Sequence, residues 1–480
     1  MAAVEREDHR QRQVVFACGM SSSSRYQSRP KVLAVRFGKR RRAALAACSS
    51  TRRRRRRVTD SDAAVTGDAS SSWASLPEDL VDLIACRVLA VDLLDYVRFR
   101  AVCPHWRSST ASPRGRGIVD RRFHPRRWMM LPEGHGLYPG HGKLRGFVRF
   151  FNLSTGAFVR VHLPLFRDHC VLDSIDGLLL LQRDHDTAAR LLNPFTGDIL
   201  DFPPLETLLP YVGSQTSQGR WFYIRHVNAT SMNVSADGVV SLMIFGGSCW
   251  SKIVFATSRE QRWRVSSYFV DQYSSPLSFQ GKIYVLRSTD CYAKPEILEI
   301  GPPQLLQGKE ELWMPPPRSI AKCPLPCSSD KTGINYPYLA ECGTEMMVVS
   351  MTNNFNKLLV HRVADLMLGR AVPVTRIGGN CLFIDRRKLY VSSKAFPTIV
   401  DDTIVFYSMQ KRMLAQYHLS SGTILPATNI PNAEDAGPSP CSIISHIYTC
   451  CYREKWNKGQ IAFRGGNNRW RVKSKWRTGA

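Results

Sequence analysis

The sequence predicts a multi-domain protein in which a small all-α module precedes an all-β domain. Three observations predict this. A capped helical segment occupies residues 75–107, short β-type runs separated by Gly, Pro, Asn and Ser extend from about residue 126 to 449, and a turn motif recurs at an offset of 41 residues. With 480 residues, 44% of them hydrophobic, the chain can form two to four domains with ample cores.

The helical segment starts with a capping box. Ser75 is followed three residues later by Glu78, and Pro77 stands in the first turn, where its missing N–H costs nothing. A helix is therefore expected to begin at Leu76. Its apolar residues recur at helical spacing and predict one apolar face, made of Leu80, Leu83, Ile84 and Val88.

Two further helices follow in the same segment. Asp92 can cap the second, and Cys103-Pro104 ends it before a short third helix that carries Trp106. The apolar residues expected on the second helix are Leu93, Leu94, Val97 and Val102. A module this small can bury only a minor core, so some of its apolar side chains must be exposed or covered by a partner.

The segment resembles the F-box, by which the substrate receptors of Skp–cullin–F-box ubiquitin ligases hold a Skp-type adaptor. The residues that carry the resemblance are Leu76, Pro77, Leu80, Ile84, Leu89, Val102, Cys103 and Trp106. The resemblance implies that these residues, together with Val97, bind the adaptor. The alternative is an ordinary amphipathic helical hairpin in the core of a larger domain.

The all-β domain is predicted from short runs of β-forming residues that no long amphipathic helix interrupts. The runs are Phe147–Phe151, Leu178–Gln182, Val239–Phe245, Lys252–Ala256, Lys282–Leu286, Met346–Met351 and Thr403–Tyr407.

A repeated turn indicates how these strands are organised. Phe151–Gly156 and Leu192–Gly197 share an Asn followed by Thr-Gly, and Tyr417–Pro426 contains a looser copy. In each copy, Gly would supply the positive φ of a tight turn between antiparallel strands. Hairpins at a period near forty residues predict a β-propeller of about six or seven blades. The alternative is a pair of β-sandwiches.

Several motifs after the helical segment resemble the large plant F-box family whose C-terminal domain, of unknown function, is a kelch-like β-propeller. They are Asp176–Leu180, Leu192–Gly197, Ser278–Tyr284 and Ala395–Pro397 before Thr403–Tyr407. Two positions depart from the family pattern: Asp385 replaces a usual Gly, and Thr398-Ile399 replaces Gly-Leu after Phe-Pro. The resemblance covers roughly residues 73–450.

The predicted domain boundaries follow from these patterns and from charge. We expect a disordered basic leader over 1–72, an F-box over 73–112, a linker and the start of the β domain over 113–145, the propeller over 146–450 and a basic tail over 451–480.

Most of the net charge of +27 lies in the two ends of the chain. The leader has 17 Lys and Arg against 6 Asp and Glu, and the tail has 9 against 1. The clusters Lys39–Arg42 and Arg52–Arg57 are typical of a bipartite nuclear-import signal. The tail mixes cations with Trp456, Phe463, Trp470 and Trp476, which permits a weaker hypothesis of single-stranded nucleic-acid binding.

Membrane, metal and catalytic signatures are weak in this sequence. No apolar run reaches the length of a membrane span, and there is no G-x-S-x-G, H-E-x-x-H or P-loop motif. His124, His135 and His141 with nearby Cys170 could be arranged as metal ligands, but twelve histidines in 480 residues make such coincidences routine. His169-Cys170 is interpreted as two buried or half-buried residues rather than a base and a nucleophile, because adjacent side chains of a strand point to opposite faces. We therefore expect no cofactor, no metal and no catalysis.

These interpretations predict a substrate receptor of a Skp–cullin–F-box ubiquitin ligase, in the nucleus, the cytoplasm or both. Its expected partners are a Skp-type adaptor, through it cullin and RING subunits, and an unknown target protein bound by the propeller. The alternatives are a free-standing propeller that binds a ligand or catalyses a reaction without ligase assembly, and a basic protein that binds nucleic acid.

Overall fold

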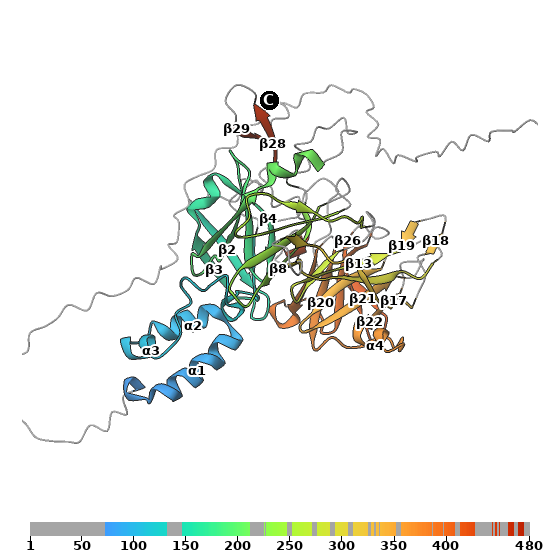
Figure 1. Ribbon diagram of the computed structural model, residues 1–480. Coiled ribbons are helices and arrows are strands. Elements are labelled where there is room, and N and C mark those ends of the chain that lie inside the picture. The colour runs from blue at the N-terminus through green and yellow to red at the C-terminus, as the bar shows by residue number, and fades with distance from the viewer. Residues whose placement is uncertain are drawn as a thin grey trace, which may run out of the picture. The chain divides into compact units, whose positions relative to one another are not determined.

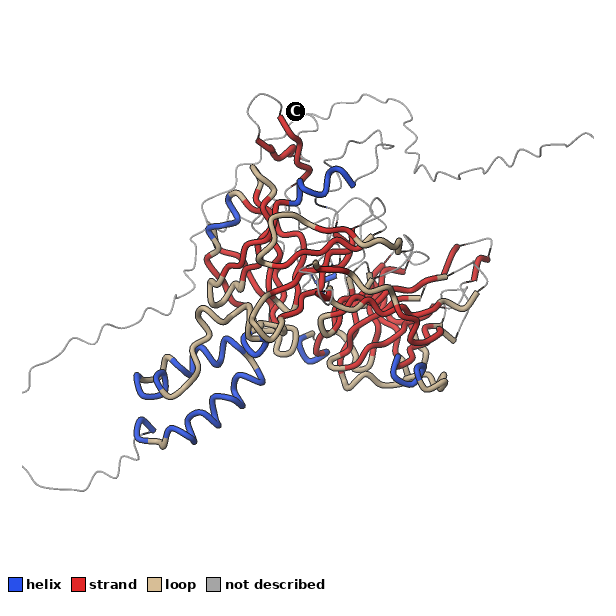
Figure 2. The backbone as a smooth tube through the Cα atoms, viewed as in Figure 1, coloured by secondary structure: helices blue, strands red, loops and turns tan. Residues whose placement is uncertain are grey.

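The computed structural model describes residues 73–131, 146–211, 225, 227–246, 252–270, 276–288, 293–305, 311–324, 328–330, 333–335, 337–351, 357–385, 387–396, 398–408, 413–427, 444, 447–448, 451, 459–464 and 469–474. Helices dominate up to residue 108 and strands dominate afterwards, as Figure 2 shows by colour. The leader predicted over 1–72 lies outside the described residues.

The N-terminal part of the described chain forms a helical module, coloured blue in Figure 1. Its elements are η1 (Trp73–Ser75), α1 (Glu78–Val91), α2 (Leu93–Arg100), α3 (Pro104–Ser108) and η2 (Arg121–Phe123). The three predicted helices are thus present. Asp92 caps α2 as predicted, because its side chain accepts hydrogen bonds from the backbone N–H groups of Leu94 and Asp95, at 2.8 and 3.2 Å.

Within the described residues, six sheets of three to five strands follow one another along the chain. Blade 1 contains β1 (Trp128–Met130), β2 (Phe147–Asn152) and β3 (Phe158–His162), and blade 2 contains β4 (His169–Ile175), β5 (Leu178–Arg183), β6 (Ala188–Leu192) and β7 (Ile199–Pro204). Blade 3 contains β8 (Val227–Val234), β9 (Val240–Gly246), β10 (Ile253–Thr257) and β11 (Arg264–Val265).

The second half of the domain continues the same arrangement. Blade 4 contains β12 (Leu277–Phe279), β13 (Lys282–Arg287), β14 (Glu296–Ile300) and β17 (Arg318–Lys322), and blade 5 contains β20 (Tyr338–Cys342), β21 (Glu345–Met351) and β22 (Leu358–Arg362). Blade 6 contains β23 (Asn380–Ile384), β24 (Lys388–Ser392), β25 (Thr403–Ser408), β26 (Met413–His418) and β27 (Ile424–Pro426). Only β23 and β25 pair in parallel among the described strands.

Shorter elements connect or flank these sheets. They are η3 (Pro164–Arg167), η4 (Leu205–Tyr211), α4 (Val363–Met367), η6 (Ser393–Ala395) and the two-stranded pairs β15 (Gln304–Leu305) with β16 (Leu312–Trp313), β18 (Ser328–Asp330) with β19 (Gly333–Asn335), and β28 (Gly459–Arg464) with β29 (Arg469–Ser474).

The hydrophobic core lies between consecutive blades and closes a ring. Strand β5 shows the principle: Leu178 and Leu180 pack toward blade 3, whereas Leu179 and Leu181 pack toward blade 1. Because successive side chains point to opposite faces of a strand, a run of four leucines buries both faces of a central strand. Similar clusters join blades 3 and 4, 4 and 5, 5 and 6, and finally 6 and 1.

This closed ring of six sheets is a β-propeller, so the alternative of two β-sandwiches is wrong. The closure between blades 6 and 1 is made by side chains, since Phe151 stacks on Phe396 at 6.1 Å, and by a backbone hydrogen bond of 2.8 Å from Ser392 N to Leu153 O. The buried residues Ile447 and Tyr448 join the same cluster.

All three copies of the repeated turn have the predicted geometry. Gly156, Gly197 and Gly422 have φ of 74°, 78° and 71°, and each donates its N–H to the backbone oxygen four residues earlier at 2.9 Å. The turns join β2 to β3, β6 to β7 and β26 to β27. The repeat in the sequence is therefore a structural repeat of blade hairpins.

Candidate partner-binding surfaces

The helical module has a small core of its own. Ala85, Leu93, Tyr96 and Phe123 are buried together, and the side chains of Leu89, Val97 and Phe99 pack against them. Tyr96 also donates its hydroxyl hydrogen to Ala111 O at 2.6 Å. This core fixes the helices, and the predicted adaptor-binding residues Leu89 and Val97 are partly buried against it.

Helix α1 begins two residues later than predicted. Pro77 is its N-cap residue and provides no capping hydrogen bond, because its ring has no acceptor, while Ser75 belongs to the preceding 3-10 turn. The predicted Ser75–Glu78 capping box is therefore wrong as the start of this helix. The first-turn acids Glu78 and Asp79 lie at the positive end of the helix dipole and favour the same start.

The apolar face predicted for α1 lies largely on the surface of the module. The fully buried residues are Val81 and Ala85, whereas Leu80 and Leu83 are 47% and 50% exposed and Ile84 is half-buried. Residues three and four apart share one side of a helix, so Leu80, Leu83 and Ile84 form a continuous apolar strip on the surface. This strip is what a partner would have to cover.

Helix α3 ties the start of the module to its end. Cys103 Sγ accepts a hydrogen bond from Trp106 N at 3.4 Å, and Pro104 occupies the first helical position. The indole of Trp106 stacks on Phe99, with ring centroids 4.3 Å apart, and its Nε1–H donates to Trp73 O at 3.0 Å. His105 Nε2 lies 2.8 Å from Leu76 O, so the Leu76-Pro77 segment is held beside α3.

The nine predicted adaptor-binding residues therefore divide into three groups. Pro77, Leu80 and Val102 are exposed, with Val102 at 62%. Leu76, Ile84, Cys103 and Trp106 are half-buried, and Leu89 and Val97 belong to the packing of the module. We call the surface formed by Leu80, Leu83, Ile84 and Val102 the apolar module surface.

A single carboxylate joins the module to the propeller. Asp92 is buried; besides capping α2 with Oδ1, it accepts hydrogen bonds on Oδ2 from Trp128 Nε1 at 2.7 Å and Asn152 Nδ2 at 2.9 Å. Asn152 in turn accepts the N–H groups of Ser154 and Thr155 on its own Oδ1. The helix cap and the first repeated turn thus share one hydrogen-bond network.

The second repeated turn makes a parallel connection. Asn193 Nδ2 donates to Gly117 O at 2.8 Å and to Phe123 O at 3.0 Å, and Asp198 accepts the N–H groups of Gly115 and Gly117 at 2.8 and 2.7 Å. Residues 113–131, from the segment predicted as a linker, are therefore packed on blades 1 and 2. Sequence reasoning missed this function of the repeat, although the shared asparagine was its visible signal.

The described part of the propeller has a groove of about 650 Å³ beside blade 3. Its lining includes Tyr211, Trp263, Arg264 and Trp313, and Arg264 is paired with Glu260 at 2.7 Å and Glu311 at 3.4 Å. The described lining contains no histidine or cysteine, so it offers no Ser–His or Cys–His pair. Aromatic and arginine side chains are instead typical of protein-binding surfaces.

A polar cluster connects strands of blades 2, 3 and 6. Thr230 donates its hydroxyl hydrogen to Asp173, and Arg387 donates to Ser174 O at 2.8 Å. Glu341 of β20 stays exposed to solvent, and its pKa is raised to about 7, chiefly by partial desolvation and to a lesser extent by the negative charge of Asp176. The hydrogen bonds of the cluster link blades 2, 3 and 6, while the Glu341 carboxyl faces solvent.

A family model described as the KIB1-4 β-propeller matches residues 150–424, which is more than half of the chain. The chain belongs to the KIB1-4 β-propeller family. The match begins in β2 and ends at the first residue of β27, so the helical module and the hairpin β28–β29 lie outside it.

Other comparisons add little to this assignment. No curated protein matches the chain. Among solved structures, a prolyl endopeptidase is 12% identical with a TM-score of 0.26, and the match covers 58% of this chain and 46% of the endopeptidase. A protein described as a putative gluconolactonase is 10% identical with a TM-score of 0.21, and that match covers 57% of this chain and 82% of the other protein. The KIB1-4 family chain thus spans under half of the endopeptidase, and no activity follows from scores this low.

The remaining predictions concern metals, histidines and the membrane. Among the residues that the structure describes, no group of three His, Cys, Asp or Glu side chains could hold a metal, and no helix is long and apolar enough to cross a membrane. His169 and Cys170 are both buried in β4, as predicted. His124 is buried beside Ile118 O, while His135 and His141 lie outside the described residues.

Proposed function

We propose that this KIB1-4 family protein is the substrate-recognition subunit of a Skp–cullin–F-box ubiquitin ligase, with residues 73–112 as its F-box. The observation that carries the proposal is the apolar module surface. Leu80, Leu83 and Val102 are about half exposed or more although the module has already filled its core with other side chains. Exposed apolar surface of this kind marks a protein interaction site.

The order of residues around this surface supports a Skp-type adaptor as the partner. Leu76-Pro77, the α1 leucines and Val102-Cys103 with Trp106 occur in the order that the F-box resemblance requires. Trp106 and Cys103 stabilise α3, and α3 holds Leu76 in place, so several F-box residues act by shaping the surface. A central apolar anchor in such an interface contributes about 2 kcal/mol or more to binding.

In this function the protein is not an enzyme. The adaptor and cullin would hold it near a ubiquitin-carrying enzyme, and the propeller would present a target protein, raising the effective concentration of target lysines. The connections through Asp92 and Asn193 support this function, since they couple the module to blades 1 and 2. We place the protein in the nucleus, the cytoplasm or both.

The test is capture of a purified Skp-type adaptor by the full-length protein. Leu80→Asp with Val102→Asp changes two exposed residues and should abolish stoichiometric capture without unfolding the module. The matched control is Leu368→Asp with Val372→Asp, which makes the same chemical change at two positions outside the module that are at least as exposed, at 68% and 63%. The control should bind like wild type.

Failure of the folded wild-type protein to capture the adaptor would refute the proposal. The same conclusion would follow if both double variants lost binding equally, because the effect would then not depend on the apolar module surface. A free-standing propeller, with the groove beside blade 3 as its binding site, would be the better description in either case.

A further inference from the structure

The hairpin β28–β29 is a part of the fold that the family match does not include. Its strands pair in antiparallel register, with Phe463 opposite Trp470 and Ile461 opposite Val472. Ile461 and Trp470 are buried in the same cluster as the leucines of blades 2 and 3. One side of the hairpin therefore completes the core between these blades.

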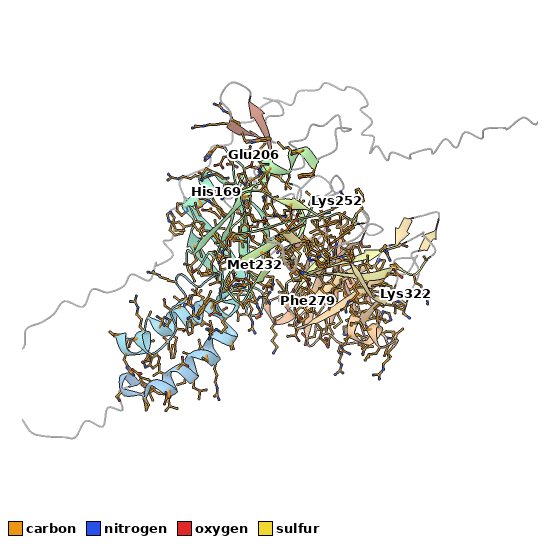
Figure 3. The ribbon with its side chains drawn as sticks, viewed as in Figure 1. His169, Glu206, Met232, Lys252, Phe279 and Lys322 are labelled. Carbon is orange, nitrogen blue, oxygen red and sulfur yellow. The ribbon has the colours of Figure 1, made fainter. Side chains whose placement is uncertain are left out.

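Trp470 anchors the hairpin through three interactions. Its side chain is only 5% exposed, its backbone N–H donates to His185 O at 3.1 Å, and its Nε1–H donates to Glu206 Oε2 at 2.7 Å. Figure 3 labels Glu206 next to the two strands. An indole held this way is not free to stack on a base, so Trp470 gives no support to the nucleic-acid hypothesis.

The hairpin attaches to the end of blade 2 that points away from the helical module. Turns in a four-stranded antiparallel meander alternate between the two ends of the sheet. The β4–β5 turn at Gly177 meets Pro125, and the β6–β7 turn at Asn193 binds Gly117, so both face the segment that follows the module. His185 in the β5–β6 turn and Glu206 after β7 belong to the opposite end.

The other side of the hairpin is basic. Arg469 and Arg471 are exposed on either side of buried Trp470. Residues 459–474 contain four cationic residues and no acidic one. The ladder places Arg464 opposite Arg469, and alternate positions along β29 are about 7 Å apart, the spacing of alternate side chains in an extended peptide.

We propose that this basic hairpin binds an acidic segment of a partner protein. The inference rests on the proposed function, for which a target must be held on the propeller away from the adaptor. The charge favours a polyanion, and the burial of Trp470 between the two exposed arginines favours carboxylates over nucleic acid, because it removes the aromatic platform that single strands use. Such binding weakens as salt screens the charges.

The test uses the full-length protein and a fluorescein-labelled peptide of alternating Glu and Ser, about twelve residues long, followed by fluorescence anisotropy at low salt and at about 150 mM salt. Arg469→Glu with Arg471→Glu should weaken binding about tenfold or more. The matched control, Arg370→Glu with Arg376→Glu, reverses two exposed arginines elsewhere and should change it less than about twofold. Both variants keep the basic leader, so its contribution cancels.

The inference would be overturned if the two variants bound the peptide with equal affinity. It would also be overturned if an oligothymidine of the same length bound more tightly than the peptide and lost as much affinity in the Arg469→Glu, Arg471→Glu variant. Arg469→Gln with Arg471→Gln, a milder change, should give a smaller loss in the same direction. Adaptor capture by the Arg469→Glu, Arg471→Glu variant separates the two proposals: it should match wild type. If the Arg469→Glu, Arg471→Glu variant lost peptide binding and neither it nor wild type captured the adaptor, the hairpin site would be supported and the ligase function refuted.

Discussion

Asp92 and Asn152 lie 60 residues apart in the chain and share a buried hydrogen bond of 2.9 Å. The same carboxylate caps α2 and accepts the indole N–H of Trp128, while the same amide shapes the first repeated turn. Local structure in the helical module and local structure in blade 1 therefore depend on one contact. This coupling gives the module and the propeller a shared stability.

We predict that Asp92→Ala lowers the free energy of unfolding by about 2–4 kcal/mol. The substitution removes the cap of α2, which costs about 1 kcal/mol, and leaves the buried donors of Trp128 and Asn152 without their acceptor, at about 1–3 kcal/mol. Urea denaturation followed by far-UV circular dichroism measures the change.

Asp95→Ala is the control for this prediction. Asp95 lies three residues further along, inside α2, but its carboxylate is exposed and pairs with exposed Arg98 at 2.9 Å. An exposed pair of this kind contributes at most about 1 kcal/mol. If the two variants were equally stable, the buried network at Asp92 would have no special energetic role.

The sequence predicted the propeller because its signals are local. Alternation of side chains in a strand and the Asn-x-x-Thr-Gly turn need no knowledge of distant residues, and the burial of β5 on both faces follows from its run of leucines. The buried face of α1 was different. Apolar residues surround much of this helix, and the burial of Ala85 depends on tertiary packing with Leu93, Tyr96 and Phe123, the last of which lies more than thirty residues later. Helical spacing alone does not carry that information.

Gly177 provides a second test of how blade 2 meets the module. Its φ is 83°, and a Cβ at this position would lie 2.1 Å from Pro125 O. Gly177→Ala should therefore cost clearly more than the roughly 1 kcal/mol of left-handed strain, because the backbone of Pro125 must move.

The control is Gly197→Ala, which isolates that contact. Gly197 has a similar φ of 78° but no atom within 4 Å of the added Cβ. It should lose only the strain energy, about 1 kcal/mol. Thermal melting of the two variants measures the difference, and equal melting temperatures would mean that the segment at Pro125 adjusts freely.

Trp470→Ala should release the hairpin β28–β29 while leaving the six blades folded. The substitution removes a buried indole and its hydrogen bond to Glu206, a loss of about 3–5 kcal/mol for the docking of the hairpin. Hydrogen exchange should accelerate in residues 459–474 and stay slow in α1 and β5. Trp313→Ala, at a partly exposed tryptophan in the groove, should leave exchange in the hairpin unchanged. Protection of residues 459–474 in both variants would contradict this anchoring function.

Glu341 should make the stability of the propeller depend on pH between about 4.5 and 7. Its pKa in the folded protein is raised to about 7, chiefly by desolvation, whereas an unfolded glutamate titrates near its ordinary value of 4.5; because the Glu341 side chain is exposed, solvent screening keeps the effect on stability small. In this window the folded state binds more protons than the unfolded state, so stability falls as pH rises and stays constant above about 7.

Glu341→Gln cannot ionise and should remove this contribution. The midpoint of urea unfolding, measured at about pH 5 and about pH 8, should therefore fall more in wild type than in Glu341→Gln. Glu345→Gln, four residues after Glu341 in the chain and paired at the surface with Arg362, should keep the wild-type difference. An identical pH dependence in Glu341→Gln and wild type would show that this carboxyl group titrates as it does in water.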